Sequence, residues 1–218
     1  MKSPLALVLA LLTGWGMAAA LNARPHSVPL PDQHDSGHPI DVGFAQQMSR
    51  HHDQALMLSR IFLQGHGSPL SALATRIVED QLFELGQMRG WLELWQAPLL
   101  PDSDSMDWMR LGQEPPGPDL QAYLLDCARS AGGMPGLASR EQIAALQSSA
   151  GTARDQLFLD LMQAHHQGGL PMLKFASREA KHPAVRQLAE RMLLQQGQEI
   201  LQMQQYRTQV KHTLRHPG

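Results

Sequence analysis

An internal repeat constrains the fold of this chain more than any other feature of its sequence. One pattern has a phenylalanine, a methionine and a histidine pair, and it occurs 114 residues apart as Phe44, Met48, His51, His52 and as Phe158, Met162, His165, His166. A second pattern has a glutamine, a glutamate and a methionine, and it occurs 115 residues apart as Gln81, Glu84, Met88 and as Gln196, Glu199, Met203. Each half is therefore predicted to form one helix hairpin, and two hairpins predict a four-helix bundle.

The rest of the chain also favours helices over strands. No segment alternates apolar and polar residues with enrichment in β-branched types, so we expect no sheet. Ser139 and Gln142 have the spacing of a capping box and predict a short helix between the hairpins. The predicted fold is all-α, a four-helix bundle with short extra helices in the linker. Its predicted parts are a first hairpin at 41–96, a linker at 97–151 and a second hairpin at 152–211, all within one shared bundle domain at 41–211.

The first 20 residues have the features of a signal peptide. A positive charge at Lys2 precedes the apolar run from Leu5 to Leu12, and Ala18 to Ala20 supply small residues for a peptidase. Cleavage near Ala20 predicts a periplasmic or secreted protein. The alternative is an uncleaved membrane anchor, for which the apolar run is only marginally long. Residues 21–40 are rich in Pro, His, Asp and Ser and predict a flexible leader.

Charge and cysteine content exclude several classes of protein. The formal net charge is −2 without a basic patch, so nucleic acid is not an expected partner. After signal cleavage no remaining stretch is apolar enough to cross a membrane. The single cysteine, Cys127, cannot form an intrachain disulfide, so the fold must depend on its core. No nucleophile elbow, phosphate loop or dinucleotide fingerprint is present, and a turnover enzyme is not expected.

The repeated histidines are predicted to point into the bundle. A helix turns 100° per residue, which places Met48, His51 and His52 within an arc of about 100°, the width of a core-facing stripe. Their counterparts in the second half have the same spacing. Glu84 and Glu199 fall on the inner faces of the helices that follow. Because buried ionisable groups are costly unless they are paired or bind a metal, this arrangement requires a physical cause.

Metal binding is the leading hypothesis, and the donor types favour copper. Imidazole with thioether suits copper, above all Cu(I), while zinc or another divalent metal stays open. The second hairpin offers more soft donors, because Met172 follows on the face of its histidines where the first hairpin has Leu58. The predicted metal-binding residues are His51, His52, His165, His166, Met48, Met162 and Met172, with Glu84 and Glu199 orienting the histidines or binding directly.

Two alternatives to a copper-binding protein stay open. In a structural or interaction bundle without metal, each glutamate accepts a hydrogen bond from a histidine of its own hairpin and fixes the helix register. In a ferritin-like metal oxidase, a bridged carboxylate pair is expected, but the Glu-x-x-His spacing occurs only from Glu179 to His182, with no counterpart in the other half. Ligand atoms that converge on one point favour metal, whereas separate His–Glu pairs favour the structural bundle.

These motifs resemble a known family of secreted bacterial proteins, the "domain of unknown function 305" family. The residues that carry the resemblance are Phe44, Met48, His51, His52 and Ala55, their second copy from Phe158 to Met172, and Met134-Pro135-Gly136 before Ser139. The resemblance spans about residues 40–207 and implies a ferritin-like bundle, with copper binding or copper resistance outside the cytoplasm in some members. The leading prediction is an exported copper-binding protein that acts in storage, buffering or delivery. The sequence departs from the family pattern at Leu58, Gly169 and Leu137.

Overall fold

Four long helices and several short ones make up the described part of the chain. The computed structural model describes residues 36–65 and 67–215, and these contain no strand. In chain order the helices are α1 (Pro39–Leu63), α2 (Ser71–Leu94), η1 (Asp107–Arg110), α3 (Pro118–Arg129), η2 (Ala131–Gly133), α4 (Arg140–Ser148), α5 (Gly151–Glu179) and α6 (Pro183–Arg215). The predicted all-α class is confirmed. The predicted signal peptide at 1–20 and most of the predicted leader at 21–40 lie outside the described residues.

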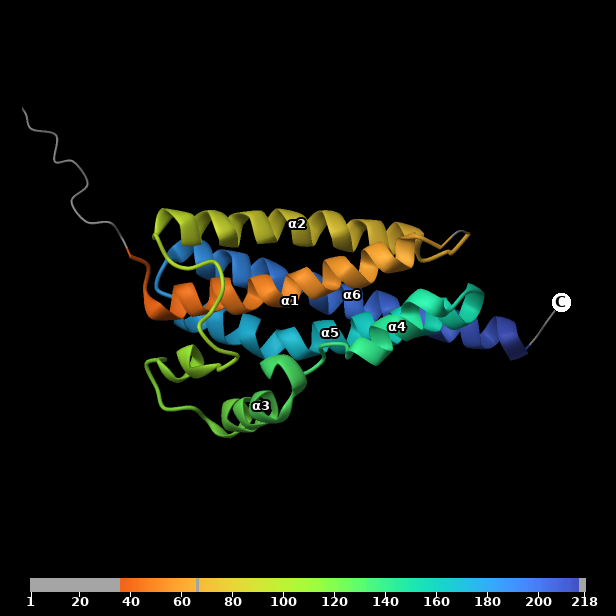
Figure 1. Ribbon diagram of the computed structural model, residues 1–218. Helices are drawn as coiled ribbons and strands as arrows, with labels where there is room; N and C mark the ends of the chain where they lie inside the picture. The colour runs from red at the N-terminus through yellow and green to blue at the C-terminus, as the bar shows by residue number, and fades with distance from the viewer. Residues whose placement is uncertain (1–35, 66, 216–218) are drawn as a thin grey trace, which may run out of the picture. The chain divides into compact units, whose positions relative to one another are not determined.

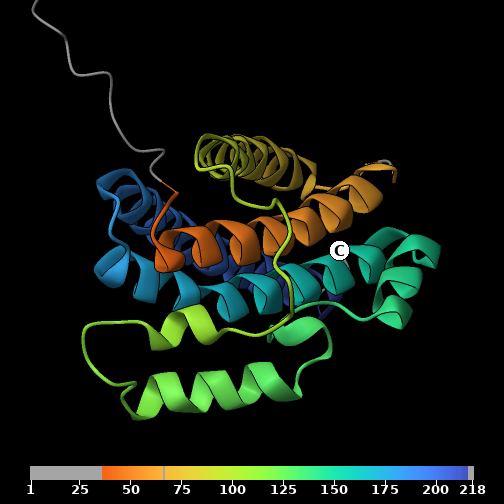
Figure 2. The ribbon, with the colours of Figure 1, turned by 60° about the vertical axis from the view of Figure 1, so that its left-hand side comes forward.

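The long helices pack as two hairpins. α1 runs along α2 and α5 runs along α6, and the two pairs meet chiefly through α1 and α5. Figures 1 and 2 show the four helices side by side, with α3 and its loops on the α5 side. Hydrogen bonds from Arg76 to Gln202 and from Arg191 to Gln87 also join α2 to α6. Within the described ranges, no helix has the length and apolar character needed to span a bilayer.

The helix ends follow from residues that the sequence supplies. α1 begins two residues before its predicted start, because Pro39 fits the first turn and His38 Nδ1 accepts a hydrogen bond from the Ile40 N–H at 3.2 Å. α4 begins with the predicted capping box, in which Ser139 and Gln142 each accept a hydrogen bond from the other's backbone N–H. The other predicted hairpin bounds, 96, 152 and 211, differ by one to four residues from the end of α2, the start of α5 and the end of α6.

Two aspartates at matching repeat positions tie the hairpins together. Asp41 in α1 accepts hydrogen bonds from the backbone N–H groups of Lys181 at 2.8 Å and His182 at 3.1 Å, in the loop before α6. Asp155 in α5 accepts one from Ser68 Oγ at 2.8 Å, in the loop before α2. Both aspartates are buried. Each hairpin therefore holds the loop of the other, which fixes the axial register of α1 against α5.

The core consists of two apolar clusters along the bundle. One contains Phe44, Met48, Met88 and Met172 among its members. The other contains Phe62, Phe158, Met162 and Met203 among its members, and its two phenylalanine rings stack with centroids 4.1 Å apart. Along both α1 and α5, the histidine pair separates the residues of one cluster from those of the other. The histidines therefore occupy a polar layer within an otherwise apolar interior.

The linker contacts both helices that carry a histidine pair, α1 and α5. On α1, the amide of Gln54 donates to the carbonyl of Ala138 at 3.1 Å and accepts from its N–H at 2.6 Å. On α5, the turn at Pro135 lies directly against the helix, because a Cβ at Gly168 would overlap the Pro135 carbonyl. Tyr123 Oη also donates a hydrogen bond to the Gly168 carbonyl at 3.1 Å. The linker thus covers α5 immediately after its histidine pair.

Candidate metal centre

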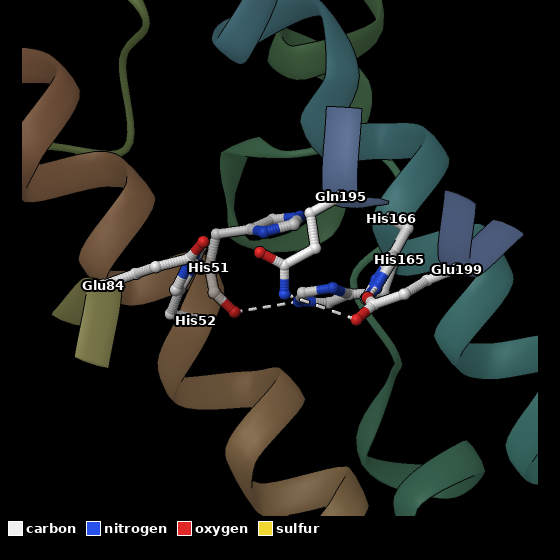
Figure 3. Close-up of polar contacts among 7 residues, drawn as sticks. All are labelled: His51, His52, Glu84, His165, His166, Gln195 and Glu199. Carbon is white, nitrogen blue, oxygen red and sulfur yellow. Dashed lines mark hydrogen bonds and ion pairs between the residues drawn. The ribbon is translucent and has the colours of Figure 1, made fainter. Parts of the chain in front are cut away.

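The four repeated histidines are completely buried in the middle of the bundle. His51 and His52 come from α1, and His165 and His166 come from α5. All four have an exposed fraction of 0%. Figure 3 shows their rings between the two helices, with Glu84 and Glu199 on either side. The interior position agrees with the helical period of the sequence.

Two of the histidines, which we call the outer histidines, bind a glutamate in their own hairpin. The Nε2–H of His52 donates to Glu84 Oε2 at 2.8 Å, and that of His166 donates to Glu199 Oε2 at 2.5 Å. Glu84 and Glu199 are themselves buried. Gln195 donates a further, longer bond of 3.5 Å to Glu199. In the neutral form of an outer histidine, which has a single N–H directed at the glutamate, the lone pair lies on Nδ1. Among the described residues neither Nδ1 has a hydrogen-bond partner.

The other two, the inner histidines, bind each other across the hairpins. The rings of His51 and His165 stack with centroids 3.7 Å apart and planes inclined by 30°. The Nε2–H of His165 donates to the backbone carbonyl of His51 at 2.8 Å, which leaves the lone pair of His165 on Nδ1. That Nδ1 and both ring nitrogens of His51 have no hydrogen-bond partner within the described chain.

Burial keeps the inner histidines neutral. The pKa of His165 falls to about 3, first because of burial and then because of the neighbouring His166. The pKa of His51 is lowered well below its ordinary value, again first by burial and then by His165. Neutral imidazole is the form that binds a metal ion, so these rings need not release a proton first.

The predicted methionine donors are buried but fall into both apolar clusters. Met48 and Met172 belong to one cluster and Met162 to the other, and all three have an exposed fraction of 0%. On their own helices, Met48 and Met162 lie three and four residues before a histidine pair, one turn away on the same face. In the part of the chain that the structure describes, no group of three or more His, Cys, Asp or Glu side chains is placed to hold a metal ion. The histidines and glutamates among the predicted site residues meet as three pairs, which are His52–Glu84, His166–Glu199 and His51–His165.

Three further residues of this region lie close to the predicted site residues but were not among them. Gln81 and Gln196 each have an exposed fraction of 2% and lie one turn before Glu84 and Glu199. Their repetition at the same distance from each glutamate was the available signal. Gly169 is the third, because a Cβ there would meet His51 Cε1 at 2.9 Å. Its missing side chain makes room for the His51 ring.

The sequence matches the model of a known protein family. The family described as "Domain of unknown function (DUF305)" matches residues 41–207. The chain belongs to the DUF305 family. No curated protein matches it. A DUF305 protein from Streptomyces coelicolor, inferred to be secreted, is 28% identical with a TM-score of 0.67, and the match covers 81% of this chain and 96% of that one. A DUF305 fragment from Deinococcus radiodurans is 27% identical with a TM-score of 0.59, and the match covers 78% and 96%.

The DUF305 fold also resembles that of CopM. The structure of CopM in its Cu(I)-bound form is 23% identical to this chain, with a TM-score of 0.54, and the match covers 78% of this chain and 96% of that one. Structures of CopM with Cu(II) and with silver also match. At this level of identity, the likeness shows a shared fold.

Proposed function

We propose that this DUF305 protein is an exported copper-binding protein that stores, buffers or delivers the metal. The observation that carries the proposal is a set of buried imidazole nitrogens that form no hydrogen bond with any described residue. Within the described residues, Nδ1 of His52, His165 and His166 and both ring nitrogens of His51 have no partner. Buried polar atoms are nearly always satisfied, so five such atoms in one layer call for a bound ligand.

A soft metal ion fits these donors. The inner histidines are held neutral by burial, and imidazole with thioether favours Cu(I). Met48 and Met162 supply buried thioethers one turn from each histidine pair. Glu84 and Glu199 hold Nε2 of the outer histidines, as outer carboxylates do for histidine ligands in metal sites. The Nδ1 atoms then serve as the ligand atoms, and the metal is cargo rather than a catalyst.

The relatives support copper and export. CopM, which shares the fold, has a Cu(I)-bound structure, and the Streptomyces coelicolor relative is inferred to be secreted. Export also agrees with the signal peptide expected at residues 1–20. Among divalent metals, zinc remains the main competitor, because imidazole and carboxylate suit it as well.

A metal-free structural bundle is the second candidate. Both outer histidines already have a carboxylate partner, at 2.8 and 2.5 Å. The described residues also lack a group of three or more His, Cys, Asp or Glu side chains around one point. In this alternative, the His–Glu pairs fix each hairpin, and the stacked inner histidines fix α1 against α5.

Anaerobic titration of the chain from residue 21 onwards with Cu(I), against a competing chelator, tests the proposal. We expect tight binding at a small defined stoichiometry, lost in the double variant His165→Ala, His166→Ala. His182→Ala is the control, because His182 is an exposed histidine in the loop that joins the two helices of the same hairpin. Circular dichroism checks that both variants stay helical. Binding no tighter than that of a peptide of residues 21–40, which has three histidines, supports the structural candidate.

A further inference from the structure

Two buried glutamines beside the histidines are not accounted for by the ligand set above. Gln81 and Gln196 are almost completely buried, and no described residue provides a hydrogen-bond partner for either atom of either amide. An unsatisfied buried amide destabilises the fold, and an apolar side chain of the same size avoids that cost. Yet both halves of the chain have glutamine here, three residues before Glu84 and Glu199. Packing alone therefore does not explain why both positions have an amide instead of an apolar side chain.

The amide of Gln196 faces the same small space as the His51 ring. A Cβ atom on Gly169 would lie 3.4 Å from Gln196 Oε1 and 3.4 Å from His51 Nε2. The glycine keeps this space open between α1 and α6. The repeat relates Gln81 to His165 as it relates Gln196 to His51. The structure therefore places an amide next to one inner histidine, His51, and the repeat extends the same pairing to Gln81 and His165, whereas each outer histidine has a carboxylate.

An amide suits a neutral imidazole in a way that a carboxylate does not. Its NH₂ donates to a ring nitrogen with a lone pair, and its oxygen accepts from a ring N–H. It therefore orients the ring in either tautomer without adding charge. A carboxylate in the same place adds a negative charge to a buried site, which increases the attraction to a divalent ion more than to a monovalent one.

We propose that Gln81 and Gln196 are positioning residues, which orient the inner histidines for the metal and set a preference for monovalent Cu(I) over divalent ions. The inference rests on the proposed copper-binding function. Under this proposal both repeats use the same arrangement, in which carboxylates orient the outer histidine rings and neutral amides orient the inner ones.

Apolar variants of similar length separate this role from packing. We expect Gln196→Met and Gln81→Met to leave the unfolding free energy of the metal-free protein unchanged or higher, while the Cu(I) affinity falls about tenfold or more, the effect typical of residues behind a metal ligand. Gln198→Met is the matched control, because Gln198 is an exposed glutamine of α6, and it should change neither quantity. A merely structural glutamine predicts the reverse, lower stability with unchanged affinity, and that result overturns the proposal.

A charged variant tests the preference for a monovalent ion. Gln196→Glu should lower the ratio of Cu(I) to Zn(II) affinity about tenfold, because the added charge favours the divalent ion. An unchanged ratio overturns the assignment of selectivity. If the unaltered protein binds no Cu(I), the proposed function fails and this inference fails with it. If the unaltered protein binds Cu(I) and both methionine variants bind it equally well, the inference alone fails.

Discussion

The two hairpins share their outer contacts but differ around their inner histidines. His52–Glu84 in the first and His166–Glu199 in the second are the same contact at matching positions, at 2.8 and 2.5 Å. The reciprocal aspartate contacts with the opposite loops match as well. Contacts present in both halves are those that hold each hairpin and set its register. The positions that differ are those at which a role of the second half alone can be tested.

Two of the differences lie on one face of α5. Gly169 and Met172 stand where α1 has Ala55 and Leu58. The missing Cβ at Gly169 leaves room for His51, and Met172 adds a buried thioether. The first hairpin therefore contributes a ring, and the second contributes the space for that ring and an additional sulfur. Four predictions test this comparison, from the largest expected effect to the smallest.

Removing the two glutamates tests the shared contact. Glu199→Ala and Glu84→Ala each leave a buried histidine nitrogen without its acceptor, which should lower the free energy of unfolding by about 2–3 kcal/mol. The Glu199 variant should lose more, because its contact is shorter and Gln195 also donates to it. Urea denaturation measures both. Glu190→Ala, an exposed carboxylate of α6, is the control and should stay within about 0.5 kcal/mol. Losses no larger than the control's contradict a structural His–Glu contact.

Adding a methyl group at two helical glycines tests the asymmetry. Gly169→Ala places Cβ 2.9 Å from His51 Cε1 and should destabilise the protein by about 1–2 kcal/mol. At Gly197→Ala in α6, nothing in the described chain lies within 4 Å of the new Cβ. That variant should stabilise by about 0.5–1 kcal/mol, because alanine favours helix more than glycine does. Thermal unfolding gives both signs, and a stabilising Gly169→Ala contradicts a packed His51 ring.

Exchanging the residues at the matched positions 58 and 172 tests the role of the extra sulfur. Met172→Leu should weaken Cu(I) binding about tenfold, or about 1.4 kcal/mol, because it removes a soft donor with little change in volume. Leu58→Met should strengthen binding by a smaller factor. Chelator competition measures both. Equal affinities for the two variants and the unaltered protein show that neither position supplies a ligand.

Both inner histidines should make the free energy of unfolding depend on pH in the same direction, although they come from different halves of the chain. An unfolded histidine binds a proton below about pH 6.5, while burial holds the pKa of His165 at about 3 and that of His51 well below its ordinary value. The unfolded state therefore gains protons first, so the free energy of unfolding is greatest above pH 6.5 and falls as the pH drops towards 3. Each inner histidine contributes about 1 kcal/mol per pH unit.

Urea denaturation between about pH 6.5 and pH 4.5 measures this slope. His165→Phe should reduce it by about 1 kcal/mol per pH unit. If His165→Phe has the slope of the unaltered protein, His165 is protonated in the folded state.

The sequence was sufficient for the helices and for the direction in which the histidines point. Both follow from the repeat and from the period of 3.6 residues, which does not depend on how the helices pack. Within each hairpin, the short connection between helices also made the contact from His52 to Glu84 foreseeable.

The contacts between hairpins were not foreseeable. The stacking of His51 on His165 depends on the axial register of α1 against α5, which Asp41 and Asp155 set from the far ends of those helices. The residue pattern of a single helix does not specify its axial register against another helix. The division of the methionines between two apolar clusters has the same origin, as does the position of the linker turn against Gly168.

Anomalous diffraction at the copper absorption edge, from crystals of the Cu(I)-loaded protein, tests the central claim most directly. We expect a copper peak in the buried layer between α1 and α5, within bonding distance of a ring nitrogen of at least one of the four histidines. Copper found only on exposed histidines, with the His52–Glu84 and His166–Glu199 pairs undisturbed and no peak in that layer, would contradict it.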